Sequence, residues 1–157
     1  MNGHHEITEG DDAPNFRFKD ENNIEKDLIQ YKGKNIVLYF YPKDFTPGCT
    51  TEASEFAKDY EFFQEKNILI LGVSPDNESS HKKFIEKMDL PFLLVSDSDN
   101  EIAKKYGVFG LKKFMGKEYM GIKRTTFLIN KEGKIEKVFQ KVKPKGHSKE
   151  VLDCFNQ

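Results

Sequence analysis

The sequence has little cysteine, almost no net charge and no long apolar run. Its 157 residues include two cysteines, Cys49 and Cys154, too few for a disulfide framework or a cysteine-built zinc site. The 25 basic residues nearly balance the 26 acidic ones, so the overall charge of −1 favours neither nucleic acid nor an anionic membrane as the main partner. The longest apolar runs have about six or seven residues, far short of the roughly 20 that span a bilayer.

Apolar and aromatic residues are nevertheless sufficient for a core. Hydrophobic residues make up 37% of the chain, with 14 Phe and 6 Tyr, which argues against wholesale disorder. We find no internal repeat and no linker long enough to divide the chain, so residues 1–157 are expected to form a single domain. No secretory signal is visible, and a cytoplasmic location is expected, where thiols stay reduced.

The apolar pattern alternates between the strand period and the helix period. Residues 36–41 form a continuous run of strand formers that predicts a buried central strand. Apolar side chains then recur on one helical face over residues 47–66. The same arguments predict hairpins over residues 15–28 and 124–139, strands over 68–73 and 92–95, and helices over 79–88, 102–106 and 147–155.

This order of elements predicts an α/β fold with a central mixed sheet, flanking helices and an N-terminal hairpin. Strands and helices that alternate and then end in a hairpin and a helix follow the order of a thioredoxin-like fold. In such a fold the reactive group lies where the first central strand ends and the next helix begins.

The segment at that position has the residues of a reactive helix start. Thr46 fits the N-cap and Pro47 the first helical position, which places Cys49 third in the helix. A thiol there faces backbone N–H groups without an intrahelical partner, at the positive end of the helix dipole. Both effects stabilise the thiolate, which is the nucleophilic form. The alternative, a small buried hydrophobe, fits poorly with the polar, tight sequence around Cys49.

Pro42, Thr46 and Cys49 spell Pro-x-x-x-Thr-x-x-Cys, and at this point the chain resembles the peroxiredoxins, whose active-site signature this is. The resemblance extends from about Gly10 to Leu152, so it is more specific than the short signature alone. Three further segments resemble the bacterioferritin comigratory protein or peroxiredoxin Q subfamily: Phe109–Tyr119, Gly121–Ile129 and Val142–His147.

The resemblance implies a thiol-dependent peroxidase with a peroxiredoxin-type fold. Cys49 would attack hydrogen peroxide or an organic hydroperoxide and become a sulfenic acid. The substrate would be bound, and the charge on its departing oxygen stabilised, by Thr46, by Arg124 and by the amides around Gly48 and Cys49. Pro42 would shield the pocket from water.

The assignment of Arg124 depends on the family motif. Without it, Arg124 would be interpreted as a surface cation, because the neighbouring Lys123 looks equally suitable. The expected partners are a hydroperoxide substrate and thioredoxin or another thiol reductant. No cofactor, metal ion, nucleic acid or membrane is expected, and both a monomer and a homodimer are open.

One position departs from the subfamily. Many members carry a resolving cysteine five residues after the first, where this chain has Ser54. Three interpretations are open: a one-cysteine enzyme reduced by an outside thiol, an enzyme resolved by Cys154, or an introduced substitution that locks one redox state. For Cys154 itself, packing in the last helix competes with the resolving role, which requires the two Cα atoms to come within about 7 Å.

Other features are interpreted as structural. His81 and His147 lie in polar segments and are expected at the surface, and His4 and His5 are expected to be a solvated tail rather than metal ligands. The apolar region Val108–Met120 is expected to cover the active-site edge of the core, or else to bind a hydroperoxide tail, a reductant or a second subunit.

Two other functions compete with a peroxidase. One is a peroxide sensor or redox relay that passes oxidation from Cys49 to a partner protein. The other is a holdase-type chaperone with a vestigial thiol. The intact set of Pro42, Thr46, Cys49 and Arg124 favours peroxide chemistry over the chaperone.

Overall fold

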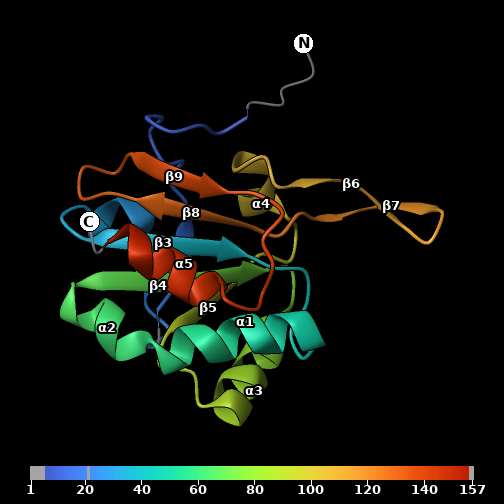
Figure 1. Cartoon of the computed structure of the whole chain (residues 1–157), viewed down its shortest axis with the longest axis horizontal. Helices are drawn as coiled ribbons and strands as arrows, with labels where there is room; N and C mark the ends of the chain where they lie inside the picture. Colours follow the sequence, from blue (N-terminus) through green and yellow to red (C-terminus); the bar gives the residue numbers. More distant parts are fainter. Residues whose placement is uncertain (1–5, 21, 156–157) are drawn as a thin grey trace.

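The computed structural model describes residues 6–20 and 22–155; His4 and His5 lie outside this range. Its main feature is a five-stranded mixed sheet with the strand order β5-β4-β3-β8-β9 (Figure 1). β4 runs parallel to β3 and β5, whereas β8 runs antiparallel to β3 and β9. The predicted thioredoxin-like fold with an N-terminal hairpin is confirmed. Within the described residues no helix is long and apolar enough to cross a membrane.

The sheet is built from β3 (Asn35–Phe40), β4 (Ile68–Ser74), β5 (Leu93–Ser96), β8 (Thr125–Ile129) and β9 (Ile135–Phe139). Two separate hairpins consist of β1 (Arg17–Lys19) with β2 (Glu25–Asp27), and of β6 (Phe109–Phe114) with β7 (Lys117–Ile122). The helices are η1, a short 3-10 helix (Leu28–Tyr31), α1 (Pro47–Lys58), α2 (Tyr60–Glu65), α3 (Glu78–Met88), α4 (Glu101–Lys105) and α5 (His147–Cys154).

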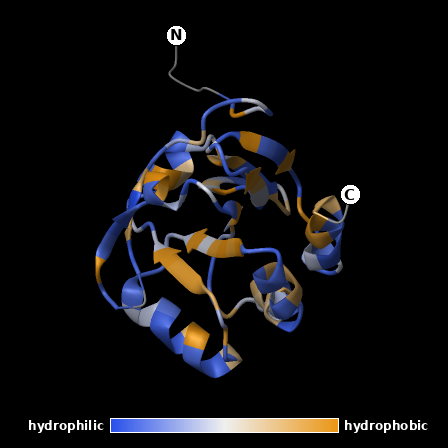
Figure 2. Ribbon diagram, turned by 90° about the vertical axis from the view of Figure 1, so that its left-hand side faces the viewer, coloured by the Kyte–Doolittle hydropathy of each residue, from blue (hydrophilic) through white to orange (hydrophobic). Residues whose placement is uncertain are grey.

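The two faces of the sheet pack against different sets of elements, because successive residues of a strand point to opposite faces. Leu38 and Phe40 of β3 pack with the N-terminal hairpin and with α4. Val37 and Tyr39 pack on the other face with α1, α2, α3 and α5. Figure 2 shows hydrophobic residues concentrated in the central strands and hydrophilic residues on the outer helices.

The structure corrects the single helical segment expected over residues 47–66. Two helices, α1 and α2, meet at Asp59. The carboxylate of Asp59 accepts a hydrogen bond of 2.8 Å from the hydroxyl of Ser148 in α5. The residue at which α1 ends and α2 begins therefore contacts α5. Local periodicity does not predict such a long-range contact.

The two histidines expected at the surface are buried. His81 is 3% exposed and His147 is 1% exposed. Nε2 of His81 lies 3.1 Å from the carbonyl oxygen of Val95, and Nε2 of His147 lies 2.8 Å from the hydroxyl of Thr126. The sequence around both residues is polar, but each ring points toward the sheet and meets a buried polar partner there.

The apolar region Val108–Met120 does not cover the core as expected. Its base is buried, but the rest forms the β6–β7 hairpin, which projects from the body of the protein (Figure 1). The two strands pair with each other in a separate sheet. Phe114 and Met115, at the tip, are 66% and 86% exposed.

The sheet register positions the candidate site. Phe40, the last residue of β3, pairs with Thr125, the first residue of β8. Arg124 therefore lies beside the carboxyl end of β3, where the chain turns toward α1. Antiparallel pairing thus brings Arg124 to the start of α1, although Arg124 and Cys49 are 75 residues apart in the sequence.

Candidate active site

Cys49 lies in the first turn of α1, as predicted. Thr46 is the N-cap with extended backbone angles (φ −81°, ψ 154°), and Pro47 occupies the first helical position. Cys49 is 2% exposed and packs in the core cluster on the helical face of the sheet. The first helical N–H groups lack intrahelical acceptors and the helix dipole is positive there, so Cys49 lies where partial positive charge gathers.

Arg124 approaches this thiol directly. Its Nη2 lies 3.3 Å from Sγ of Cys49, and its Nη1 donates a hydrogen bond of 2.7 Å to Oε1 of Glu52. Burial alone would lower the pKa of Arg124, but the charges of Glu52 and Cys49 outweigh it and raise that pKa. The guanidinium therefore stays protonated and holds a fixed positive charge beside the sulfur.

Glu52 is a site residue that the sequence analysis did not single out. It is 1% exposed, and its Oε2 is buried without a hydrogen-bond partner. Burial raises its pKa to about 7, an effect that Arg124 only partly offsets. Cys49 and Glu52 are three residues apart in one helix, so they share a face, and this spacing could have identified Glu52.

The pH dependence of stability follows from the raised pKa of Glu52. Between about pH 4.5 and 7 the native protein binds this proton more tightly than the unfolded chain, so rising pH favours unfolding. Relative to Glu52→Gln, the wild-type free energy of unfolding is expected to fall by about 3 kcal/mol across this window. Urea titrations of both proteins at several pH values measure the difference, and parallel curves would contradict it.

Gly48 permits the close approach of Arg124 to the helix start. A Cβ atom at this position would lie 3.2 Å from Nη2 of Arg124 and 3.4 Å from Cγ of Pro144. The amide of Val142 also donates a hydrogen bond of 3.2 Å to the carbonyl oxygen of Arg124. Val142 thus holds the backbone of Arg124 in place, a role that its basic surroundings in the sequence do not indicate.

Thr46 and Pro42 lie on the loop that leads into α1. The Thr46 hydroxyl donates a hydrogen bond of 2.9 Å to the carbonyl oxygen of Lys43. Because that bond uses the hydroxyl proton, the lone pairs of the oxygen remain to accept a hydrogen bond. Both side chains are half-buried, between the end of β3 and the first turn of α1.

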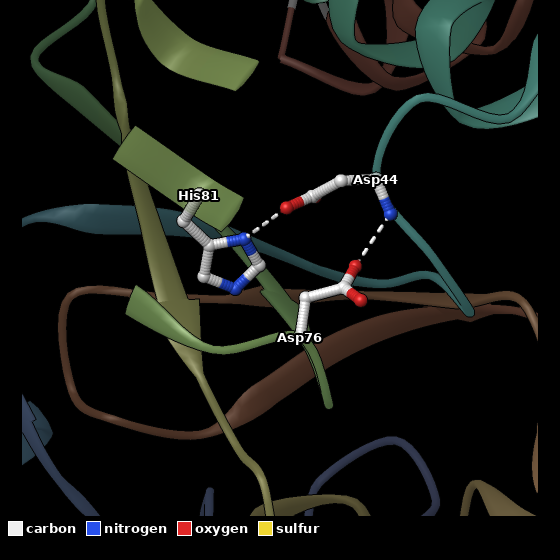
Figure 3. Close-up of side chains that lie close together, drawn as sticks. All are labelled: Asp44, Asp76 and His81. Atoms are coloured by element: carbon white, nitrogen blue, oxygen red, sulfur yellow. Dashed lines mark hydrogen bonds and ion pairs between the residues drawn. The ribbon is translucent and has the colours of Figure 1, made fainter. Parts of the chain in front are cut away.

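A polar cluster anchors the loop between β3 and α1 to α3 and to the residues before it (Figure 3). The Asp44 carboxylate lies 2.7 Å from Nδ1 of His81 and accepts hydrogen bonds from the hydroxyls of Tyr41 and Ser80, at 2.6 and 2.8 Å. The Asp44 amide donates to the carboxylate of Asp76. We call Asp44, Asp76 and His81 the loop brace, because they connect the β3–α1 loop to the β4–α3 connection and to α3.

The ligand atoms of the loop brace lie within 4.8 Å of one another, a spacing that a metal ion could bridge. However, both Asp44 oxygens have hydrogen-bond partners, and both His81 nitrogens face acceptors, the Asp44 carboxylate and the Val95 carbonyl. The cluster is therefore satisfied by the protein itself. Burial would raise the pKa of Asp44, but its hydrogen bonds to His81 and Tyr41 outweigh it and lower that pKa.

The structure does not bring Cys154 to Cys49. Both thiols are free, and Cys154 shares a surface pocket with Asn35 and Asn130, at the amino end of β3 and the end of β8. Cys49 follows the opposite end of β3, and a six-residue strand is about 17 Å long at its spacing of about 3.3 Å per residue. Ser54 is exposed on α1.

Comparisons with known proteins show the family of the chain. A family model described as the AhpC/TSA family matches residues 9–138. Peroxiredoxin Bcp of Bacillus subtilis (strain 168) is 52% identical over 146 residues, which cover 93% of each chain. The bacterioferritin comigratory protein of Xanthomonas campestris, studied for alkyl peroxide reduction, has a TM-score of 0.84 at 37% identity and 90% coverage of both chains. A yeast mitochondrial 1-Cys peroxiredoxin, studied for thiol resolution by glutathione/thioredoxin systems, has a TM-score of 0.79 at 26% identity over 96% of this chain and 75% of its own.

A thioredoxin-like fold with such relatives defines the class of the protein, a peroxiredoxin, and so a thiol-dependent peroxidase. The chain belongs to the AhpC/TSA family, and within it to the Bcp/peroxiredoxin Q group. The resemblance that began from the short cysteine motif is thereby confirmed over nearly the whole chain.

Proposed function

We propose that Cys49 is the peroxidatic cysteine and that the enzyme reduces hydrogen peroxide and organic hydroperoxides through a Cys49 sulfenic acid. The supporting observation is the 3.3 Å contact between Nη2 of Arg124 and Sγ of Cys49. This contact places a permanent cation beside a thiol that already lies at the positive end of a helix.

In the first half of the cycle the Cys49 thiolate attacks the terminal oxygen of the hydroperoxide. An S–O bond forms while the O–O bond breaks, and the departing oxygen leaves with the bonding electrons and takes up a proton as water or an alcohol. Arg124 and the first amides of α1 donate toward this developing charge. Thr46 accepts a hydrogen bond from the hydroperoxide O–H, because its own hydroxyl donates to the Lys43 carbonyl. Pro42 limits access of water to the pocket.

In the second half an outside thiol reduces the sulfenic acid. Its sulfur displaces water to form a mixed disulfide with Cys49, and a second thiol releases Cys49 as a thiolate and leaves as a disulfide. Ser54 cannot replace that thiol, and Cys154 lies at the other end of β3. Thioredoxin or a small cytoplasmic thiol is the proposed reductant, in line with the resolution by outside thiols described for the yeast relative.

The proposal is tested by trapping the sulfenic acid. Reduced protein is mixed with one equivalent of hydrogen peroxide in the presence of dimedone, and the adduct is mapped by peptide mass spectrometry. The adduct is expected on Cys49 in the wild-type protein and in Cys154→Ser, and no adduct is expected in Cys49→Ser. Labelling of Cys154 in place of Cys49 would refute the assignment.

Turnover separates a peroxidase from a sensor. With dithiothreitol or the thioredoxin system as reductant, peroxide consumption is expected at the same rate in the wild-type protein and in Cys154→Ser. If the wild type turns over and Cys154→Ser does not, Cys154 is the resolving cysteine. Rapid formation of the sulfenic acid without turnover would instead favour the sensor or relay.

A further inference from the structure

The β6–β7 hairpin projects from the same end of the sheet as the candidate active site (Figure 1). β7 ends at Ile122, and Arg124 follows two residues later. The buried side chains of Val108 and Ile122 fix the base of the hairpin to the core. Whatever the hairpin contacts is therefore brought to the side of the molecule where Cys49 lies.

The hairpin carries an unusual share of exposed apolar surface. Five of the nine large exposed apolar side chains in the described part of the chain belong to it: Leu111, Phe114, Met115, Tyr119 and Met120. Soluble proteins seldom gather such side chains on one projecting element unless that element contacts a partner.

The same element is basic, although the chain as a whole is slightly acidic. Residues 109–122 contain three lysines and one anion, Glu118, a net charge of +2 in a chain with a net charge of −1. The ion pair between Lys113 and Glu118 is 3.8 Å long, and both side chains are more than half exposed, so it holds the lysine only weakly. The near-neutral total charge therefore conceals a local concentration of positive charge.

The strand register places the apolar and basic groups together at the tip. Phe114 pairs with Lys117, and Lys113 pairs with Glu118 one step further back. Met115 lies in the turn between the strands, at the most exposed point of the hairpin. An apolar tip flanked by lysines matches the boundary of a phospholipid bilayer, with acyl chains below anionic headgroups.

We propose that the β6–β7 hairpin docks on the surface of an anionic phospholipid bilayer, with Phe114 and Met115 inserted among the lipids and Lys113 and Lys117 at the phosphate groups. A bilayer accepts a convex tip without a complementary groove. Pairing of two hairpins from two copies of this chain would bring like charges together, so the charge argues against a second copy as the occupant.

Docking has a consequence for substrate choice, which rests on the proposed function. The hydroperoxide group of an oxidised acyl chain is polar and is drawn toward the bilayer surface. A docked hairpin holds the Cys49 pocket near that surface. Membrane lipid hydroperoxides are therefore the substrate class that docking favours.

Vesicle cosedimentation tests the docking without any turnover. Reduced wild-type protein and Cys49→Ser are mixed with vesicles of phosphatidylglycerol and phosphatidylcholine, or of phosphatidylcholine alone. Both proteins are expected to sediment with the anionic vesicles at low salt and to be released by high salt. Phe114→Ser/Met115→Ser and Lys113→Gln/Lys117→Gln are each expected to weaken binding by about tenfold or more.

Matched variants on other elements serve as controls. Ile24→Ser/Phe62→Ser removes two apolar side chains that are each 54% exposed, and Lys58→Gln/Lys149→Gln removes two exposed charges. Both controls are expected to bind anionic vesicles like the wild type. Absence of binding to anionic vesicles, equal loss in the controls, or a stable dimer that the tip variants dissociate would overturn the proposal.

Activity assays then test the substrate consequence separately. The tip variants are expected to lose turnover of phospholipid hydroperoxides in anionic vesicles while reducing hydrogen peroxide at the wild-type rate. Tip variants that turn over both substrates at the wild-type rate would refute this consequence. Inactivity of the wild type on both would refute the proposed function and leave the docking result standing.

Discussion

Replacing Arg124 with alanine is expected to slow the reaction of Cys49 with hydrogen peroxide by about 10²- to 10³-fold, the effect of removing one donor that stabilises developing charge. The guanidinium lies 3.3 Å from the Cys49 sulfur, and its charge is permanent. Stopped-flow measurement of sulfenic acid formation under single-turnover conditions gives the rate. Lys123→Ala, at the exposed neighbouring position, is the matched control and is expected to react like the wild type.

A second comparison separates chemistry from stability in this prediction. Removing Arg124 alone leaves Glu52 buried without its cation, and such an unpaired charge destabilises a protein by several kcal/mol. Arg124→Ala/Glu52→Gln removes that penalty and is still expected to react slowly. A rate within twofold of the wild type in either variant would show that Arg124 does not assist the reaction.

Replacing Asp44 with asparagine is expected to lower the free energy of unfolding by about 1–3 kcal/mol at neutral pH, the cost of leaving buried hydrogen-bond donors without their charged acceptor. The side chains of Asp44 and His81 are 1% and 3% exposed and lie 2.7 Å apart. Urea denaturation measures the difference, and Asp99→Asn, at an exposed position, is the control. A loss no larger than that of the control would contradict the role of the loop brace.

The pH dependence of this loss has a defined sign. The pKa of Asp44 is lower in the folded protein than in the unfolded chain, so its contribution is complete above about pH 4. It is lost as the pH falls through the folded-state pKa. The difference between the wild type and Asp44→Asn is therefore expected to shrink in acid, opposite to the trend predicted for Glu52.

The fold was largely predictable because its elements are encoded locally. The apolar run at residues 36–41 predicted β3, and Thr46 with Pro47 predicted the start of α1. The short motif Pro-x-x-x-Thr-x-x-Cys then marked the position of Cys49. These signals depend on neighbouring residues, and local sequence contains that information.

The remaining site residues depend on contacts between distant segments. Arg124 meets Cys49 because β8 pairs with β3, and no local pattern distinguished it from Lys123. His81 looked like a surface residue, yet it is buried against Asp44, 37 residues away. Glu52 was the exception, since its helical spacing from Cys49 was visible and was not used.

Net charge was the least informative sequence quantity. The total of −1 argued against an anionic partner, but it is a sum over the whole chain and does not say where the charges lie. The register of β6 and β7 showed that the lysines gather on one projecting hairpin. A chain can therefore be slightly acidic overall and still present an element with a net positive charge.

The burial of Cys49 has a kinetic consequence for the proposed cycle. Cys49 is only 2% exposed. A small peroxide can still reach its sulfur, but a reducing protein must bring its own sulfur to about 2 Å from it. The first turn of α1 must therefore open before each reduction, and Ser54 supplies no thiol to capture the sulfenic acid sooner. During that interval a second peroxide can oxidise the sulfur to a sulfinic acid, which ordinary thiols do not reverse. The ratio of reductant to peroxide then determines how many turnovers one molecule completes.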